Sequence, residues 1–180
     1  MSDTFTGAIE IGEGFAGDGP NAAHINTVLG LRSGPVGMAF ATALAQPTPG
    51  HVPFLAVYAP NVPVQPATLF VNKATIVADE HGNLTWGAAQ AGVAAGVTEH
   101  AAPRFSTNEL ANLVLIVAVW VNPAAHDAQA VFANNRLATS TALRRGQHER
   151  DDSTTSAIAA LRAGTLPNNP YFSPAHHTHP

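Results

Sequence analysis

A histidine and an asparagine directly after a glycine-rich turn are the residues best placed to do chemistry in this sequence. Gly17 and Gly19 flank Asp18, so the backbone there can turn sharply or adopt a positive φ angle. The residues that follow alternate as they do in a strand, which places His24 and Asn26 on the same face. A histidine in this position can give or take a proton near neutral pH. The alternative is a histidine that only satisfies its hydrogen bonds on a half-buried strand.

A lysine in an apolar segment is the second candidate for chemistry. The sequence over 68–77 predicts a strand, in which Lys73 and Thr75 share one face. A lysine there either protects an edge strand from pairing with another chain or contacts a ligand in a cleft. These residues alone leave both interpretations open.

The composition limits which classes of protein this chain can belong to. Its 180 residues fit one domain, and 46% of them are hydrophobic while only 11% are charged. So little charge favours apolar surfaces that are buried between subunits. The net charge of −4, without a basic stripe, argues against nucleic acid and anionic membranes as partners. The absence of cysteine excludes disulfides and thiolate chemistry.

No segment has the pattern of an export signal or of a membrane span. Residues 1–10 are polar and lack a basic start followed by an apolar core. The longest apolar run, 113–121, is too short to cross a bilayer. We therefore expect a cytoplasmic protein.

Alternation and helical periodicity predict an α/β fold, with one mixed sheet of about five strands and helices packed on one face. The strongest strand is 113–121, LVLIVAVWV, which we expect to be central and covered on both faces. Four further segments are expected to form strands: 5–11, 22–30, 54–58 and 68–77. Helices are expected in five places: after Pro35, from Thr85 to Val97, after Ser106 with Glu109 completing a capping box, over 125–147, and over 153–163.

Local signals also predict how these elements begin and pack. Asp79 to Asn83 is expected to be a turn, and Thr85 to cap the helix that follows it. Three glycines in that helix would permit close approach to a sheet or to a neighbouring subunit: Gly87, Gly92 and Gly96. We expect residues 1–164 to form the domain and residues 165–180 to form an extended tail.

Three segments, in this order and spacing, resemble the formaldehyde-activating enzyme family: GFAGDGPNAAHINTVLG, LAVYAPNVPVQPATLFVNKATI and WGAAQAGVAAGV. The likeness runs from about Gly12 to about Thr141. Members of this family condense formaldehyde with tetrahydromethanopterin to give methylene-tetrahydromethanopterin and water. The resemblance therefore implies a carbon–oxygen lyase of one-carbon metabolism and methylotrophy. It also implies a ribosomal-protein-like unit with a left-handed βαβ crossover, a homopentamer, and a pterin site at the subunit interfaces.

The resemblance assigns roles to six positions. His24 matches the catalytic histidine of the family. Four positions match residues that contact the cofactor: Leu55, Lys73, Thr75 and Gln90. At the sixth position, where the family has an aspartate that contacts the cofactor, this chain has Asn26. An amide offers a neutral acceptor and two donors in place of charged acceptor oxygens.

The chemistry that the resemblance implies needs a proton donor. The pterin amine attacks formaldehyde to give a hydroxymethyl adduct, and loss of water leaves an iminium ion that the second nitrogen captures. Hydroxide is a poor leaving group, so protonation of that oxygen by His24 would help, by roughly 10²–10⁴-fold. Neutral contacts such as Thr75 and Gln90 would position the two nitrogens. No metal is required.

Other interpretations of the same residues stay open. The chain is an enzyme, or it is a paralogue that binds a reduced pterin or formaldehyde without turnover, as a carrier or sensor; Asn26 favours the second interpretation. Three histidines near the end of the chain could instead bind zinc or nickel: His176, His177 and His179. Lys73 could form a Schiff base with formaldehyde, although the family mechanism implies only a cofactor contact.

Overall fold

The computed structural model describes residues 9–148 and 153–165. The chain divides into two compact units, Met1–Gln147 and His148–Pro180, and the sheet belongs to the first. Among the described residues, no helix combines the length and the apolar character needed to cross a membrane.

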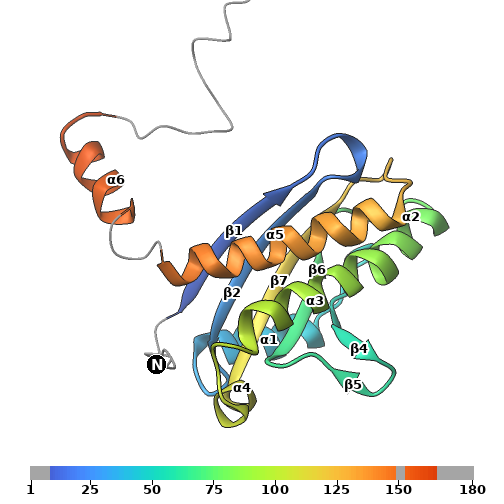
Figure 1. The fold of residues 1–180 in the computed structure, drawn as a ribbon, viewed down its shortest axis with the longest axis horizontal. Coiled ribbons are helices and arrows are strands. Elements are labelled where there is room, and N and C mark those ends of the chain that lie inside the picture. Colours follow the sequence, from blue (N-terminus) through green and yellow to red (C-terminus); the bar gives the residue numbers. More distant parts are fainter. Residues whose placement is uncertain (1–8, 149–152, 166–180) are drawn as a thin grey trace, which may run out of the picture. The chain divides into compact units, whose positions relative to one another are not determined.

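A mixed sheet of five strands forms the centre of the first unit (Figure 1). Its strands lie in the order β1 (Glu10–Ala16), β2 (Ala23–Leu31), β7 (Leu113–Val121), β6 (Ala67–Asn72) and β3 (Phe54–Leu55). Only β6 and β7 pair in parallel, and the other three pairs are antiparallel. A separate two-stranded ribbon consists of β4 (Val57–Ala59) and β5 (Val62–Pro63). The predicted α/β class and the single mixed sheet are confirmed.

The helical segments between the strands have well-defined bounds. α1 (Pro35–Ala45) follows β2 and starts at a proline, which suits the first turn of a helix. The connection from β6 to β7 contains α2 (Asp79–Asn83), the π-helical segment η2 (Leu84–Ala89), α3 (Gln90–Ala101) and α4 (Thr107–Asn112). It joins two parallel strands, as a βαβ unit does, and its hand stays a prediction. The predicted capping box of Ser106 and Glu109 is confirmed at the start of α4.

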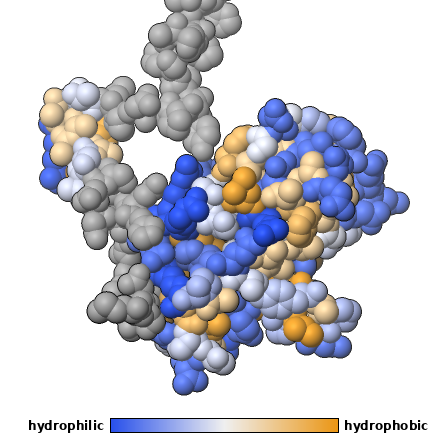
Figure 2. Space-filling model, viewed as in Figure 1, coloured by the Kyte–Doolittle hydropathy of each residue, from blue (hydrophilic) through white to orange (hydrophobic). Residues whose placement is uncertain are grey.

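Two long helices, α3 and α5 (Ala128–His148), cover one face of the sheet (Figure 1). Every second residue of β2 and β7 is buried against these helices. The sheet and the helices both contribute apolar side chains to the core, among them Ile25, Leu29, Val117, Val119, Val93, Val97 and Val131. Burying such side chains is worth roughly 1.5–3 kcal/mol each. The side of the molecule that carries these helices shows hydrophilic and hydrophobic residues interspersed (Figure 2).

Glycines allow the helices to approach closely. A Cβ atom at Gly12 would lie 1.8 Å from the carbonyl oxygen of Ala142, and one at Gly14 would lie 2.1 Å from that of Ala138, so β1 contacts α5 through its bare backbone. Gly92 and Gly96 of α3 contact the backbone of α5 in the same way. Their close approach therefore serves packing within the chain.

The first and third predicted strands differ from those observed. β1 begins at Glu10, later than the predicted 5–11, and residues 1–8 lie outside the described residues. The strand was hard to recognise from the sequence because glycine is unfavourable in a strand unless another backbone approaches closely. The predicted strand 54–58 divides at Ala56 into β3 and β4, and Leu55 and Tyr58 are exposed instead of buried.

Three further expectations are wrong in detail. β7 is covered on both faces only at its start, where α1 contacts it and Val114 is buried; further along, Ile116, Ala118 and Trp120 alternate with its buried residues and stay partly exposed. The segment Asp79–Asn83 is helical instead of a turn. Thr85 caps no helix: it is buried within η2 and its hydroxyl donates to the carbonyl oxygen of His81.

The second unit contributes one described helix, α6 (Ser153–Arg162). It ends at Arg162, one residue before the end of the predicted range 153–163, and Gly164 follows with a left-handed φ of 78°. The predicted tail begins with Thr165, and its remaining residues, 166–180, lie outside the described residues, together with the three histidines considered as metal ligands.

Candidate functional site

Polar residues gather on the face of the sheet opposite α3 and α5. His24 and Asn26 alternate with the buried residues of β2 and project together from that face, as predicted. The register places Phe15 and Trp120 on either side of His24, and Glu13 opposite Asn26. This open face therefore presents a histidine flanked by two aromatic residues.

Glu13 and His24 form a close pair between neighbouring strands. The Oε1 atom of Glu13 lies 2.6 Å from Nε2 of His24, and both side chains are partly exposed, at 42% and 35%. A carboxylate only accepts hydrogen bonds, so Nε2 carries the proton of the ring. The pair fixes the orientation of the imidazole and leaves Nδ1 on the other edge.

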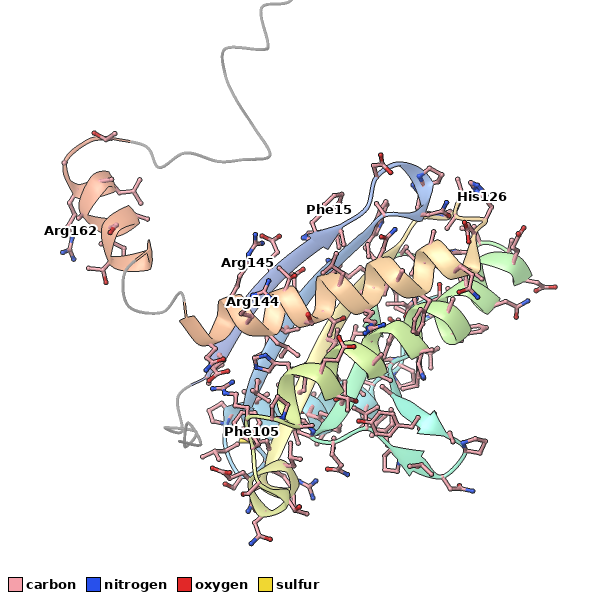
Figure 3. The ribbon with its side chains drawn as sticks, viewed as in Figure 1. Phe15, Phe105, His126, Arg144, Arg145 and Arg162 are labelled. Carbon is pink, nitrogen blue, oxygen red and sulfur yellow. The ribbon has the colours of Figure 1, made fainter. Side chains whose placement is uncertain are left out.

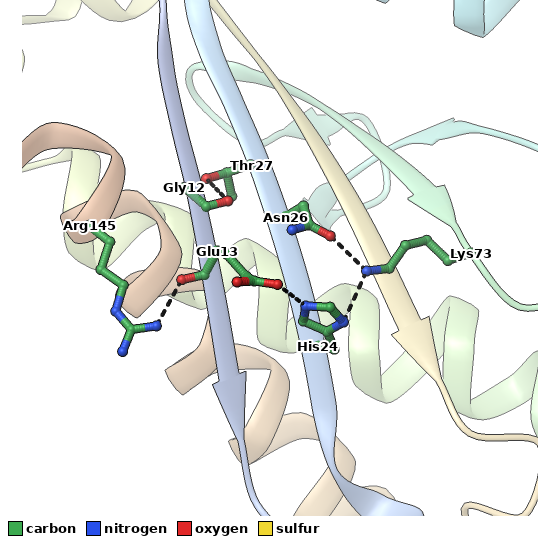
Figure 4. A network of polar contacts seen from close by, with 7 residues as sticks. All are labelled: Gly12, Glu13, His24, Asn26, Thr27, Lys73 and Arg145. Atoms are coloured by element: carbon green, nitrogen blue, oxygen red, sulfur yellow. Dashed lines mark hydrogen bonds and ion pairs between the residues drawn. The ribbon is translucent and has the colours of Figure 1, made fainter. Parts of the chain in front are cut away.

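Lys73 approaches that other edge from the end of β6 (Figure 4). Its Nζ atom donates to Oδ1 of Asn26 at 2.8 Å and lies 3.5 Å from Nδ1 of His24. Burial lowers the pKa of Lys73, and the negative charge of Glu13 partly counteracts this. The four side chains thus form a chain of contacts from Glu13 through His24 to Lys73 and Asn26.

The position of Lys73 argues against one of its two interpretations, that of an edge-strand guard. β6 lies between β7 and β3, so Lys73 does not protect an edge strand. The strand also ends at Asn72, earlier than predicted, although the backbone N–H of Lys73 still donates to the carbonyl oxygen of Val119 in β7. The side chain of Lys73 reaches across β7 to His24 and Asn26 on β2. Lys73 and Thr75 consequently do not share the face of one strand.

Two side chains donate hydrogen bonds to the backbone of β1 at Gly12 and Glu13. The guanidinium of Arg145 donates to the carbonyl oxygen of Glu13 at 3.2 Å, and the hydroxyl of Thr27 donates to that of Gly12 at 3.4 Å (Figure 4). Arg144 and Arg145 stand near the end of α5 beside β1 (Figure 3). Arg145 therefore ties the end of α5 to the backbone of β1.

Glu13 is the residue of this cluster that sequence reasoning missed. Its segment, IGEGFA, alternates as a strand does, but the glycines on either side of Glu13 concealed the alternation. With the strand read as 10–16, Glu13 would have been placed opposite Asn26 on a neighbouring strand.

Thr75 lies in a second, smaller arrangement. Nδ1 of His51 is 3.0 Å from the carbonyl oxygen of Asn72, and Nε2 is 2.9 Å from the hydroxyl of Thr75. A carbonyl only accepts, so Nδ1 carries the proton; in the neutral ring, Nε2 then accepts the proton of Thr75. The exposed hydroxyl of Thr75 is left with its lone pairs for other partners.

Leu55 and Gln90 line an apolar pocket of about 440 Å³. The other lining residues are Val52, Phe54, Val57 and Trp86. The amide nitrogen of Gln90 donates to the carbonyl oxygen of Val57 at 2.9 Å, which orients the side chain and leaves its own oxygen as an acceptor. A flat, largely apolar ring with polar edges would suit such a pocket.

The structure thus brings some of the predicted site residues together and not others. His24, Asn26 and Lys73 converge on the open face, Leu55 and Gln90 share the pocket, and Thr75 contacts His51. Within the ranges 9–148 and 153–165, no group of three or more His, Asp or Glu side chains could hold a metal ion.

A family model and individual known proteins both match this chain. The family model "Formaldehyde-activating enzyme (Fae)" matches residues 11–161. The bifunctional enzyme Fae/Hps of Methanosphaera stadtmanae is 35% identical over 185 residues, covering 97% of this chain and 45% of that protein. The protein of the same name from Methanothrix thermoacetophila is 39% identical over 136 residues, covering 75% of this chain and 35% of its own length.

The chain spans less than half the length of these relatives, and the match lies over the strands and helices that carry the cluster on the open face. The resemblance carried by the segments around His24, Lys73 and Gln90 is therefore confirmed. This chain belongs to the formaldehyde-activating enzyme family.

Proposed function

We propose that this chain condenses formaldehyde with tetrahydromethanopterin, with release of water, and that His24 is the general acid. The observation that carries the proposal is the imidazole of His24 on the open face of the sheet, held at 2.6 Å by the carboxylate of Glu13. Membership of the formaldehyde-activating enzyme family supports the choice of formaldehyde as substrate.

The geometry suits proton transfer to a leaving hydroxyl. Glu13 stabilises positive charge on the ring of His24 while the ring holds an extra proton, and it fixes the edge that faces the reactants. Nδ1, on the side of Lys73, is then the atom that gives its proton to the oxygen of the hydroxymethyl adduct. The carbon–oxygen bond breaks, water leaves, and the second pterin nitrogen closes on the iminium carbon.

Glu13 also bears on the absence of an aspartate at position 26. The neutral amide of Asn26 accepts a hydrogen bond from Lys73 and gives His24 no anionic neighbour. Glu13 supplies that neighbour from the adjacent strand. The proton donor therefore keeps a negative partner in this chain.

The pterin would use the second group of residues. Gln90 and Leu55 line the apolar pocket, where the exposed indole of Trp86 offers a flat surface for a ring. Gln90 belongs to the helix that covers one face of the sheet, whereas His24 projects from the opposite face. We therefore propose that the complete site forms between neighbouring copies, in the homopentamer that the family resemblance implies.

A second candidate function rests on Asn26. A chain that has exchanged the family's carboxylate for an amide could bind a reduced pterin or formaldehyde as a carrier or sensor, without turnover. The retention of His24 and Lys73 in one network of contacts favours the enzyme.

The test is the rate of methylene-pterin formation relative to the spontaneous reaction, with tetrahydromethanopterin and tetrahydrofolate in parallel. The proposal expects acceleration with tetrahydromethanopterin that His24→Ala removes, while binding of the pterin persists. Binding of the pterin by wild type without any acceleration would support the carrier instead. Sedimentation as a monomer at micromolar concentration would contradict the assembly.

A further inference from the structure

Lys73 is the only lysine among the 180 residues, and the chain has no cysteine. Primary amines and thiols are the side chains that add most readily to a small aldehyde. A protein that handles formaldehyde thus carries a single side-chain amine, and that amine lies in the cluster on the open face beside His24.

The surroundings of Lys73 favour a reactive amine. Its firm hydrogen-bond partner, Oδ1 of Asn26, is neutral, so no carboxylate holds the side chain in the ammonium form at that contact. Burial lowers its pKa, while the more distant charge of Glu13 acts in the opposite direction. Nδ1 of His24, 3.5 Å away, can receive a proton from the ammonium group.

We propose that Lys73 captures formaldehyde covalently, as an iminium ion, and passes its carbon to the pterin. This inference rests on the proposed function, because it names how the same site takes its aldehyde. The ε-amine is the nucleophile, His24 moves the protons, and a nitrogen of the pterin is the second amine that takes the carbon from Lys73.

The capture balances without any further reactant. Nδ1 of His24 takes one proton from the ammonium of Lys73, and the free amine adds to the carbonyl carbon of formaldehyde. A proton moves from that nitrogen to the oxygen, which gives a hydroxymethylamine. His24 returns its proton to the hydroxyl, the carbon–oxygen bond breaks, and water leaves. The sum is one ammonium and one formaldehyde converted to one iminium ion and one water.

The release balances in the same way. One nitrogen of the reduced pterin attacks the iminium carbon, and the second nitrogen displaces the ε-amine from it. Two nitrogen–hydrogen bonds of the pterin are lost, two carbon–nitrogen bonds form, and both protons end on Lys73 as its ammonium group. The lysine is regenerated, so the step is catalytic.

The test traps the iminium ion in the complete chain. Wild type is incubated at pH 7 with carbon-13 formaldehyde and cyanoborohydride, and methylation of Lys73 is followed by peptide mass. Nα-acetyl-lysine methylamide in the same tube is the reference, since an ordinary lysine with a pKa of about 10.4 is almost fully protonated at this pH. We expect Lys73 to react at least about ten times faster than the reference.

Two variants sharpen the result. Lys73→Arg keeps a cation that can donate to Asn26 but has no amine for an iminium ion, so we expect a folded protein that loses both trapping and pterin turnover. Asn26→Asp places a carboxylate at the ammonium group, which favours the protonated amine, so trapping at pH 7 should fall by about ten-fold.

The outcomes separate this inference from the proposed function. Methylation of Lys73 no faster than the reference, or full turnover by Lys73→Arg, would overturn covalent capture and leave the condensation activity standing. Rapid trapping at Lys73 in a wild type that does not accelerate methylene-pterin formation would support capture and remove the condensation. Rapid trapping together with turnover that Lys73→Arg abolishes would support both.

Discussion

On β1, Gly12 and Gly14 face α5, whereas Glu13 and Phe15 point to the opposite side of the sheet. On β2, Ile25 is buried in the core, and His24 and Asn26 on either side of it reach the open face. At Gly12 and Gly14 the helix-covered face leaves no room for an added side-chain atom, while the open face presents groups that can exchange protons. Neighbouring residues of one strand should therefore respond to substitution in different ways.

The largest expected effect is on the packed face. Gly14→Ala places a methyl group 2.1 Å from the carbonyl oxygen of Ala138, so α5 must shift, and we expect a loss of about 3 kcal/mol or more in the free energy of unfolding, or failure to fold. Denaturation in urea measures this loss. Gly87→Ala is the matched control, because nothing lies within 4 Å of its added Cβ and a helix gains up to about 1 kcal/mol from alanine.

His24→Ala should show most clearly that a residue of the open face affects activity and not stability. We expect methylene-pterin formation to fall by roughly 10²–10⁴-fold, the usual contribution of a general acid, while the urea midpoint stays nearly unchanged. Steady-state kinetics and denaturation on the same sample check both parts. A large loss of stability with preserved turnover would place His24 among the structural residues.

Glu13→Gln is expected to have an intermediate effect. The amide keeps the size of the side chain but removes the negative charge that holds and orients the ring of His24, so turnover should fall about ten-fold. Lys73 is the other charged side chain that faces this ring. Steady-state kinetics measures the fall in turnover, and Glu13→Asp, which keeps the charge, should retain more of the wild-type rate.

The smallest expected effect is the pH dependence of stability at Lys73. Its pKa is lowered in the folded chain, so the unfolded chain binds the proton more tightly. The cost of burying the ammonium is therefore fully present below the folded pKa, and it is relieved as pH rises towards the unfolded value of about 10.4. Wild type should gain stability relative to Lys73→Met over that alkaline range. Parallel urea titrations would contradict this if the two curves kept a constant separation.

Local signals were sufficient for β2, β7 and the capping box of α4, because alternation, a continuous apolar run and a Ser–Glu pair each depend on residues close in sequence. The bounds of β1 were predicted wrongly because its glycines are needed for close contact with the backbone of α5. That contact joins segments far apart in the sequence, so no local pattern reveals it. Thr85 was expected to cap a helix, but it lies within the π-helical segment η2, where its hydroxyl donates to the carbonyl oxygen of His81.

The same distinction applies to the site. The shared face of His24 and Asn26 follows from alternation, so it could be predicted. The contact of Lys73 with Asn26 depends on how β6 is ordered in the sheet and on where it ends. The pairing of Glu13 with His24 depends on the register between β1 and β2, which the misplaced first strand hid.

The contact between His51 and Thr75 has a consequence for what a ligand must present. Nδ1 of His51 donates its proton to the carbonyl oxygen of Asn72, so Nε2 of the neutral ring accepts the hydroxyl proton of Thr75. The oxygen of Thr75 can then only accept hydrogen bonds from a ligand. A reduced pterin carries N–H groups where its aromatic, oxidised form has bare nitrogen lone pairs. In the pterin site that we propose, a hydroxyl of fixed polarity would thus discriminate between oxidation states of one ring, and it would do so through a histidine that need not touch the ligand.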